Sequence, residues 1–527
     1  MLQPVQKADV VVVGAGVAGL SAALRLTAAG VSTAVLEAAP FVGGRMSTEK
    51  VDGFRLDRIG QLLFTSYPEL CTTPGLDGLV LRPFAPGVLV HGAGRRHHAG
   101  GPEGVLGGAR EACEAHEGER EGADGGTAAV DRGRWKVPAA ASGLGGALAT
   151  VAPPAPPVFP AQPTRPAAVA RTRAGAVAAI RMTGLRARRP RLGRLRPRPG
   201  WHTPVPPAGS GPLVGAGDRA RLASALAGIA AAPVERLLGR AGMPAAEALT
   251  ARGVPASAVD GFLRPLLAAL LCDPELSGSS RCADLALRAW ATGRLCVPEG
   301  GAEVLPELLA RALPPGTVHT GVRVTSVSTT SVTTAEHGEF GCRAVLLATD
   351  ARTAAELLPG LRVPDFHQVT VVHHTTTQAP DTGAFLLLDA ERGGPVAHTA
   401  VVSQVDPTRA PAGRALISST LLGTPPEDVD GAARDHLARL YGVSTRAWET
   451  LAVHRTVEAV PVMRPSNGLR RSVRLLAGLY VCGDHRDTGT VQGALHSGHR
   501  ASAAILRDLR TGTGVRRGEP VPRPRAA

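Results

Sequence analysis

The chain has 527 residues, of which 44% are hydrophobic and 3% aromatic, and its formal net charge is +14. This length exceeds one ordinary hydrophobic core, so we expect more than one domain. Residues 132–217 contain fourteen Lys and Arg and no acidic residue, which equals the whole surplus of positive charge. Because the chain offers few aromatic rings for base stacking, this local charge does not indicate a nucleic-acid surface.

Two further classes of protein are disfavoured by composition. The cysteines show no CxxC or metal-like spacing, so we predict neither a disulfide framework nor a metal site. They are Cys71, Cys113, Cys272, Cys282, Cys296, Cys342 and Cys482. No uninterrupted apolar run has membrane-spanning length, and no charged leader precedes the first apolar stretch. We therefore expect a cytoplasmic protein without a transmembrane segment.

The first predicted element is a strand at Val10–Val13, because four apolar residues in a row are typical of a parallel strand covered on both faces. Three glycines follow it. In a dinucleotide-binding unit they supply a tight turn, room for a pyrophosphate and close packing of helix on strand, in the order Gly14, Gly16 and Gly19. The start of the chain therefore predicts a phosphate-binding βαβ unit.

The same unit continues with a helix from about Ala18 to Ala29, which Gly30 ends as a left-handed cap. A second strand, Ser32–Leu36, delivers Glu37, whose carboxylate can accept hydrogen bonds from ribose hydroxyls. Because an acidic residue at this point disfavours a 2′-phosphate, NADP is not expected.

A second glycine pair and an arginine, Gly43, Gly44 and Arg45, then follow, which is unusual for units that bind NAD. With them, the stretches GAGVAGL, LEAAPFVGGR and GFRLDRIGQLL resemble the superfamily of flavin-containing amine oxidases, phytoene desaturases and protoporphyrinogen oxidases. The resemblance implies an FAD-dependent oxidoreductase in which Arg45 faces the phosphates or the flavin. It also implies an α/β fold, in which a Rossmann-like FAD-binding domain of the GR2 type is interleaved with a substrate domain of mixed sheet and helices.

Two later segments carry the same resemblance. Residues 297–327 resemble the family's segment that returns to the FAD domain, where Val324 would meet the adenine through its backbone. Near the C-terminus, GLYVCGDHRDTGTVQGALHSGHRAS begins with a predicted strand at Leu479–Cys482, followed by Gly483 and Asp484. The resemblance implies that Asp484 holds ribityl or phosphate oxygens.

A helix that opens at Val491–Ala494 would point its positive N-terminus at the flavin, where reduced flavin tends to carry negative charge. Cys482 does not stand where the family tethers its flavin, so we expect non-covalent FAD. The cofactor-binding residues implied by the resemblance are Gly14, Ala15, Gly16, Ala18, Gly19, Glu37, Ala38, Gly43, Gly44, Arg45, Gly60, Gln61, Val324, Gly483, Asp484, Val491, Gln492 and Ala494.

The segment from about His97 to Ser210 is rich in Ala, Pro, Gly and Arg and has no steady period of 2 or 3.6 residues. One interpretation is a solvated, disordered insertion. The other is out-of-frame translation of GC-rich DNA, which the 3 lysines against 55 arginines of the chain would fit. A shift of codon-position bias at both ends of the segment would distinguish the two.

The substrate domain is expected to begin with a hairpin at Val88–Arg96 that turns at Gly92–Gly94. Periodic Leu and Ala predict helices at Arg219–Ala231, Pro233–Arg240, Pro244–Ala251, Gly261–Leu271 and Ala283–Ala291. The apolar stretch GFLRPLLAALLCDPEL, Gly261–Leu276, fits a buried core helix, with a lipid-like channel or a membrane contact as the alternative. Strands are expected at Phe366–Thr377, Ala384–Leu388, Val396–Val405 and Ala415–Thr420, with a helix at Val429–Leu440.

The resulting domain plan alternates between the two parts. The FAD-binding domain takes residues 1–75, 297–362 and 466–510. The substrate domain takes a hairpin at 76–98, helices at 213–296 and a sheet at 363–465. The insertion takes 99–212, and 511–527 form a disordered tail.

The expected reaction is transfer of a hydride from a small or hydrophobic organic substrate to flavin N5, with oxygen or a quinone as the final acceptor. An amine and an allylic C–H both fit, but many amine oxidases of the family place a lysine beside N5, and this chain has only Lys7, Lys50 and Lys136. That absence favours chemistry like that of a carotenoid or isoprenoid desaturase.

No catalytic residue is assigned from the sequence, and the oligomeric state stays open. His373 or His374 could face the flavin, or each could be a surface histidine or a hydrogen-bonded core histidine. With so few aromatic rings, Trp290 and Tyr480 do not indicate an amine-binding cage. The alternative of another class is an FAD-binding protein whose insertion has disabled catalysis, whereas an NAD-only dehydrogenase does not fit the C-terminal Gly-Asp motif.

Overall fold

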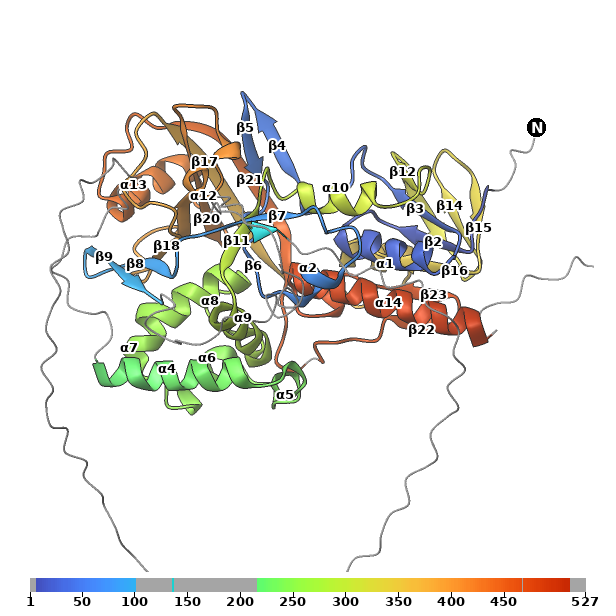
Figure 1. Ribbon diagram of the computed structural model, residues 1–527, viewed down its shortest axis with the longest axis horizontal. Coiled ribbons are helices and arrows are strands. Elements are labelled where there is room, and N and C mark those ends of the chain that lie inside the picture. The colour runs from blue at the N-terminus through green and yellow to red at the C-terminus, as the bar shows by residue number, and fades with distance from the viewer. Residues whose placement is uncertain (1–5, 101–134, 137–215, 467, 512–527) are drawn as a thin grey trace, which may run out of the picture. The chain divides into compact units, whose positions relative to one another are not determined.

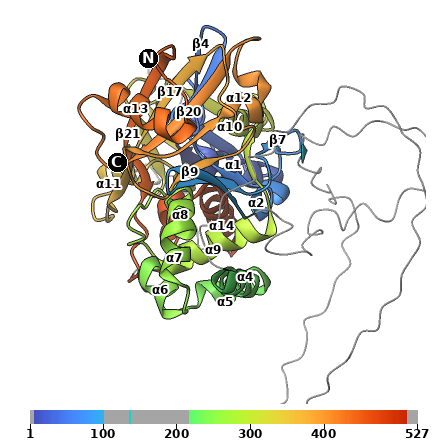
Figure 2. The same cartoon turned by 90° about the vertical axis from the view of Figure 1, so that its left-hand side faces the viewer.

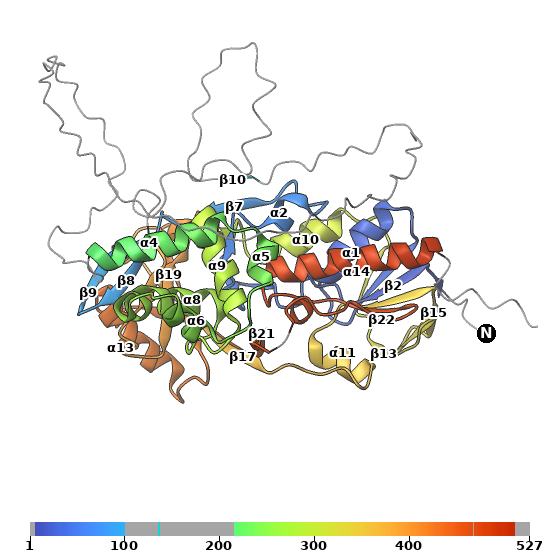
Figure 3. The same ribbon diagram turned by 90° about the horizontal axis from the view of Figure 1, so that it is seen from below.

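The computed structural model describes residues 6–100, 135–136, 216–466 and 468–511. Most of the predicted insertion, including nearly all of the basic segment, and the tail after Thr511 lie outside these ranges. Figure 1 shows the ribbon, and Figures 2 and 3 show it from two other sides.

A six-stranded sheet carries the glycine-rich unit and is mainly parallel, as predicted (Figure 1). Its strand β2 (Val10–Val13) is buried on both faces. Val10 and Val12 pack toward helix α1 (Val17–Ala28), and Val11 and Val13 pack into a separate core cluster. β22 runs antiparallel to β23 and the other pairs are parallel, in the order β12 (Val318–Thr320), β3 (Thr33–Glu37), β2, β16 (Ala344–Leu347), β23 (Leu479–Val481) and β22 (Arg474–Leu476).

A smaller four-stranded sheet covers the second face of β2. Val332 and Phe340 from this sheet share a core cluster with Val11 and Val13. Its strands stand in the order β1 (Gln6–Lys7), β15 (Glu339–Gly341), β14 (Ser331–Thr334) and β13 (Val324–Val327). Helix α1 covers one face of β2 and this sheet covers the other, which explains why the strand is an unbroken apolar run.

Helix α14 (Val491–Thr511) packs along α1 and joins the last segment of the chain to the first βαβ unit (Figure 3). A Cβ at Gly498 would lie 2.3 Å from the carbonyl oxygen of Ala18, so the two helices approach as closely as they do because this residue is glycine. The remaining helices of this part are α2 (Pro68–Thr72), α10 (Val304–Arg311), α11 (Ala351–Leu357) and the short η4 (Asp484–Arg486).

The second part of the fold is a seven-stranded mixed sheet. Its strand order is β21 (Glu449–Pro461), β17 (Phe366–Thr376), β20 (Ala415–Leu422), β19 (Val396–Val401), β18 (Leu387–Asp389), β8 (Val88–Gly92) and β9 (Arg95–Ala99). The predicted hairpin is present, and Ala93 and Gly94 form its turn with φ values of 52° and 68°. Helix α13 (Val429–Tyr441) packs on one face of this sheet.

The structure corrects two predicted strands of this sheet, one of which, expected at Ala384–Leu388, begins only at Leu387 as β18. β19 ends at Val401, so the expectation of a strand over Val396–Val405 is wrong for its last four residues, which form helix α12 (Val402–Val405). The short helix η3 (Pro407–Arg409) follows and carries Arg409 back toward the first part of the fold. Residues 402–405 read VSQV, which fits the end of a strand as well as a short helix, so the sequence does not show this turn.

Helices gather on the other side of the sheet and supply its second core cluster (Figures 1 and 2). They are α4 (Ala216–Ala231), α5 (Val234–Leu238), α6 (Ala245–Ala251), α7 (Ala256–Ala258), α8 (Arg264–Leu271) and α9 (Ser280–Thr292). A π-helical turn, η2 (Val259–Leu263), precedes α8, and the buried residues of α8 agree with a core helix. In the described part of the chain, no helix is both long enough and apolar enough to cross a membrane.

Two small sheets lie between the part built on the six-stranded sheet and the part built on the seven-stranded sheet. One has the order β10 (Trp135–Lys136), β7 (Val80–Pro83), β11 (Leu295–Pro298) and β6 (Leu63–Phe64). β10 lies within the segment predicted to be a disordered insertion and pairs antiparallel with β7. The other small sheet is the hairpin of β4 (Thr48–Val51) and β5 (Phe54–Asp57).

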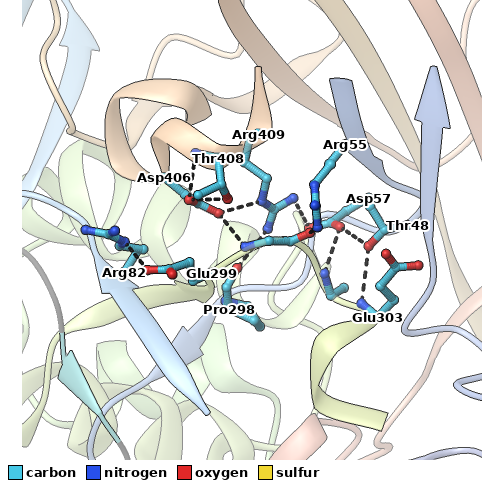
Figure 4. Close-up of polar contacts among 12 residues, drawn as sticks. Thr48, Arg55, Asp57, Arg82, Pro298, Glu299, Glu303, Asp406, Thr408 and Arg409 are labelled. Carbon is cyan, nitrogen blue, oxygen red and sulfur yellow. Dashed lines mark hydrogen bonds and ion pairs between the residues drawn. The ribbon is translucent and has the colours of Figure 1, made fainter. Parts of the chain in front are cut away.

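A buried guanidinium joins these two small sheets (Figure 4). Arg409 is 1% exposed, and it donates to Asp57 Oδ2 at 2.8 Å from Nη1 and to Asp406 Oδ2 at 3.0 Å from Nε. Its Nη2 donates to the carbonyl oxygen of Pro298 at 3.2 Å. One side chain therefore joins β5, η3 and the turn after β11.

The two carboxylates also hold the backbone of that turn. Asp406 Oδ2 accepts from Gly300 N at 2.8 Å, and Asp57 Oδ1 accepts from Ala302 N at 2.9 Å and from Thr48 Oγ1 at 2.7 Å (Figure 4). Burial by itself would raise the pKa of Asp57, but Arg409 and these hydrogen bonds outweigh it and hold the pKa below its usual value. Asp57 therefore stays ionised and fully engaged.

Replacing Arg409 with Met should destabilise the fold strongly, because it leaves two buried carboxylates without their cation. We expect a loss of about 3 to 5 kcal/mol in the free energy of unfolding, measured by urea denaturation. Arg58→Met is the matched control, since the Arg58 side chain is 53% exposed and pairs with Glu49 at 3.4 Å. This control should cost at most about 1 kcal/mol, and an equal cost for both variants would contradict the role of Arg409.

Candidate functional site

A cleft of about 400 Å³ lies at the carboxyl ends of β2, β3 and β16, where open α/β sheets bind their ligands. The cleft brings together parts of the chain that are far apart in sequence. It is lined by most of the residues that the resemblance assigns to FAD: Gly14, Gly16, Ala18, Glu37, Ala38, Gly43, Gly44, Arg45, Gln61, Val324, Gly483, Asp484, Val491 and Ala494.

The glycines leave the floor of the cleft open. Gly14 has a φ of 104°, which a residue with a side chain rarely adopts. A Cβ at Gly19 would lie 2.2 Å from the carbonyl oxygen of Gly14, so α1 can follow β2 this closely only with glycine there. A Cβ at Gly16 would meet no protein atom within 4 Å, so the space above it is free for a phosphate group.

Glu37 stands at the end of β3 with its carboxylate fixed by two backbone amides. Oε2 accepts from Ala15 N at 2.7 Å and Oε1 accepts from Ala39 N at 2.9 Å. Each oxygen keeps a second lone pair, so the carboxylate can still accept from hydroxyl groups in the cleft. This is the geometry that recognition of a ribose requires.

Arg45 and Asp484 lie 439 positions apart in the sequence and contact each other in the cleft. Arg45 Nη2 donates to Asp484 Oδ1 at 2.6 Å, and Nη1 donates to the carbonyl oxygen of Ala459 at 2.7 Å. Burial would raise the pKa of Asp484, but the Arg45 guanidinium holds that pKa below its usual value. The pair therefore stays ionised and fixes the C-terminal Gly-Asp turn to the N-terminal glycine pair.

Helix α14 begins at the same cleft. Thr490 caps it, because Thr490 Oγ1 accepts from Gly493 N at 3.1 Å, and both Thr490 and Val491 line the cleft. The positive end of the helix dipole thus lies where the sequence predicted it.

Some predicted cofactor residues do not line the cleft. Ala15 and Gly19 act through the contacts above, and Gly60 lines a second cavity. Gln492 turns away, since its Oε1 accepts from Glu69 N at 3.0 Å in the neighbouring helix α2. Whether these residues contact the cofactor stays a prediction.

The sequence reasoning missed several lining residues, among them Arg323, Thr349 and Asp350. Asp350 is the third residue after the buried strand β16, and its carboxylate caps α11 by accepting from Thr353 N at 2.9 Å. A polar pair at the end of an apolar strand could have indicated the edge of the sheet. Arg323 carries no such signal, because only the pairing of β12 with β3 brings it to the cleft.

A second cavity of about 40 Å³ adjoins the cleft, and Gln61 lines both. Gln61 Oε1 is shielded from solvent and has no hydrogen-bond partner among the described residues. An unpartnered buried amide oxygen is unfavourable, so a ligand that donates a hydrogen bond here would stabilise it. The open glycine floor, the fixed acid and this amide oxygen fit a flavin dinucleotide.

The seven-stranded sheet forms one wall of the second cavity through His373, His398 and Thr420. His373 has both ring nitrogens occupied, by Ser418 Oγ at 2.9 Å and by the carbonyl oxygen of Asp57 at 3.0 Å. His374 points to the opposite face and meets Asp430 at 2.9 Å. Both are therefore hydrogen-bonded core histidines, which was one of the interpretations.

The lysines and aromatic residues considered from the sequence lie elsewhere. Lys7, Lys50 and Lys136 belong to β1, β4 and β10, so the seven-stranded sheet has no lysine. Trp290 packs edge-to-face on Phe262 in the helical part.

Comparison with known proteins now decides the family. Residues 182–506, more than half of the chain, match the family of flavin containing amine oxidoreductases, and residues 12–72 match the NAD(P)-binding Rossmann-like domain. The chain belongs to the flavin containing amine oxidoreductase family. The family match begins within the segment predicted to be an insertion. Membership makes the chain an oxidoreductase with a flavin cofactor and confirms the predicted fold class.

Curated relatives match over short stretches. Putrescine oxidase of Kocuria rosea is 55% identical over 62 residues, which are 12% of this chain and 13% of that protein. Hydroxysqualene dehydroxylase of Rhodopseudomonas palustris is 30% identical over 170 residues, or 31% and 38% of the two chains. Phytoene desaturase of Cercospora nicotianae is 36% identical over 87 residues, or 15% and 14%. The matches thus span less than two fifths of each relative.

Solved structures share the fold over nearly the whole chain. A double mutant of putrescine oxidase matches with a TM-score of 0.58 at 16% identity, covering 96% of this chain and 100% of the other. An oxidoreductase from Methanosarcina mazei matches with a TM-score of 0.59 at 15% identity, covering 95% and 100%. At such identities the likeness concerns the fold alone.

Removing the acid at the end of β3 should weaken cofactor binding. We expect Glu37→Ala to cost roughly 1 to 3 kcal/mol of FAD binding free energy, because it removes a hydrogen-bonded carboxylate, and Asp484→Ala to cost a similar amount. Titration of the apoprotein with FAD measures the effect. Glu307→Ala, on the exposed side of α10, is the control and should bind FAD as the unmodified protein does. Unchanged binding in both site variants would refute these assignments.

The buried histidines predict a loss of stability in mild acid. Burial lowers the pKa of His373, His398 and His485 to about 4. The unfolded chain binds protons near pH 6.5 and the folded chain does not, so this stability is complete above pH 6.5 and is lost as pH falls toward 4. Urea denaturation at pH 5 should show roughly 1 to 2 kcal/mol less stability per histidine than at pH 7.5. A flat profile between these values would contradict the burial.

Proposed function

We propose that the protein holds FAD non-covalently in the cleft and oxidises an uncharged, mainly apolar organic substrate that enters from the side of the second cavity. The observation that carries this proposal is the junction at Gln61, which lines both spaces. A substrate in the second cavity would thus lie beside the cofactor without passing through solvent.

Non-covalent binding is supported by the chemistry of the cleft wall. Among its described lining residues there is no cysteine, histidine or tyrosine that could attack the flavin ring. Cys482 is fully buried, does not line the cleft, and has a pKa raised to about 12 by burial, so its thiol is not nucleophilic.

Bound FAD would supply a hydride acceptor at its N5, and oxygen or a quinone would take the electrons onward. The chain itself would bind and orient. Glu37 would fix the ribose, and the start of α14 would place positive potential where the reduced cofactor gains negative charge. The walls of the second cavity would exclude water from the reacting carbon.

The second cavity favours an allylic C–H over a charged amine. Its acid, Asp57, is engaged by Arg409, Ala302 N and Thr48, so it offers no carboxylate to an ammonium group. Leu62, Phe84 and Leu386 make much of the remaining wall apolar. A charged substrate would lose its hydration there without compensation, whereas a hydrocarbon would gain from burial.

Anaerobic bleaching of the flavin tests the proposal. We expect a panel of uncharged isoprenoids in detergent micelles to include compounds that bleach the oxidised flavin, and putrescine to leave it oxidised, because the cavity does not compensate a cation. Dithionite is the control and should reduce the flavin fully. Bleaching by putrescine alone would contradict the proposal. Reduction by dithionite and by no organic compound would favour a catalytically inactive FAD-binding protein.

A further inference from the structure

The second cavity contains a polar side chain that the fold itself does not use. His398, on β19, is 4% exposed, and its Nδ1 is shielded from solvent without a hydrogen-bond partner among the described residues. It lies opposite Leu388 and Thr420 on the two neighbouring strands. Because a buried polar atom without a partner is unfavourable, the fold alone gives no reason for an imidazole at this position.

The other histidine of the cavity shows the difference. His373 bonds through one ring nitrogen to Ser418 and through the other to the backbone of Asp57, so it connects the sheet to β5 and has no capacity left for a ligand. Of the two cavity histidines, His398 is the one with an open hydrogen-bonding position.

The size and charge of the cavity limit what could fill that position. A volume of about 40 Å³ exceeds the roughly 10 to 15 Å³ that one water molecule needs, so part of a larger ligand fits. Burial lowers the pKa of His398 to about 4, which leaves the ring neutral at pH 7. Asp57 and Arg409 on the wall pair with each other at 2.8 Å, so neither charge is free for a ligand. A cation or an anion would therefore find no counter-charge.

We propose that His398 determines substrate specificity by hydrogen-bonding one uncharged polar group, such as a hydroxyl, of an otherwise apolar substrate. A neutral imidazole donates from one nitrogen and accepts at the other, so it can serve a hydroxyl in either sense. The inference rests on the proposed function, because it takes the second cavity as the substrate side of the flavin cleft.

The binding of three probes of similar shape tests the inference without requiring that any of them be oxidised. Benzyl alcohol carries a hydroxyl, toluene lacks it, and benzylamine is a cation at pH 7. Dissociation constants come from the perturbation of the oxidised flavin spectrum of the holoprotein. We expect benzyl alcohol to bind roughly 3- to 10-fold more tightly than toluene, the effect of one neutral hydrogen bond, and benzylamine to bind more weakly than both.

Variants of β19 test whether the preference for benzyl alcohol over toluene comes from the side chain of His398. His398→Leu should bind benzyl alcohol and toluene equally, whereas His398→Asn, whose amide can occupy the place of Nδ1, should keep the preference. Thr399→Val is the matched control, because Thr399 points to the opposite face, where it bonds Ser419 and Tyr441. It should keep the full preference for the alcohol.

Each outcome decides the inference separately from the reaction. The inference is supported if His398→Leu loses the preference for the alcohol while Thr399→Val keeps it. This holds even if no compound bleaches the flavin and the proposed oxidation fails. Equal binding of alcohol and toluene to the unmodified protein would overturn it, and would indicate that water alone occupies the position. If His398→Leu does not retain flavin, loss of the preference in His398→Asn would overturn it, and its retention would support it.

Discussion

One buried cation, Arg409, holds together the segments that meet between the two parts of the fold. Placing a guanidinium where water cannot reach it is costly, and the cost is met only because Asp57, Asp406 and a backbone carbonyl surround it. The same carboxylates accept from Gly300 N and Ala302 N, so the turn that returns the chain to the parallel sheet is fixed by the charges that stabilise Arg409. The carboxylates that stabilise Arg409 therefore also fix the backbone of this turn.

That arrangement has a consequence for the substrate. Because Asp57 is committed to the cation, the second cavity has an acid on its wall but no negative charge to spare. The fold is shared with putrescine oxidase, and the paired charges support our proposal that this cavity takes an uncharged group. The cleft differs, since Glu37 and Asp484 are fixed by hydrogen bonds and line its wall, and the Arg45 guanidinium holds the pKa of Asp484 below its usual value. Under the proposed function, a polar cofactor cleft thus adjoins a substrate cavity whose charged groups are already paired.

The sequence predicted those parts of the site whose interacting residues are close together in the chain or belong to a recognisable motif. The glycines and Glu37 follow from turn sterics and strand order within one βαβ unit, and Asp484 followed from a spaced motif that resembles the family. Arg409 could not be predicted, because its partner Asp57 lies 352 positions away and no local pattern marks an arginine that follows Asp-Pro-Thr. His398 could not be separated from His373 either, since the difference lies in which cross-strand neighbours occupy the ring nitrogens. The helix at the end of β19 could not be predicted for another reason, because VSQV at residues 402–405 fits a strand as well as a short helix.

We propose that distant segments of the chain form one cleft for non-covalent FAD, and the absorption spectrum of the purified protein is the test. We expect the visible bands of an oxidised flavin, and FAD in the supernatant once the protein is denatured and removed. A soluble but colourless protein that takes up no added FAD would contradict the site. Flavin that stays with the denatured chain would contradict non-covalent binding.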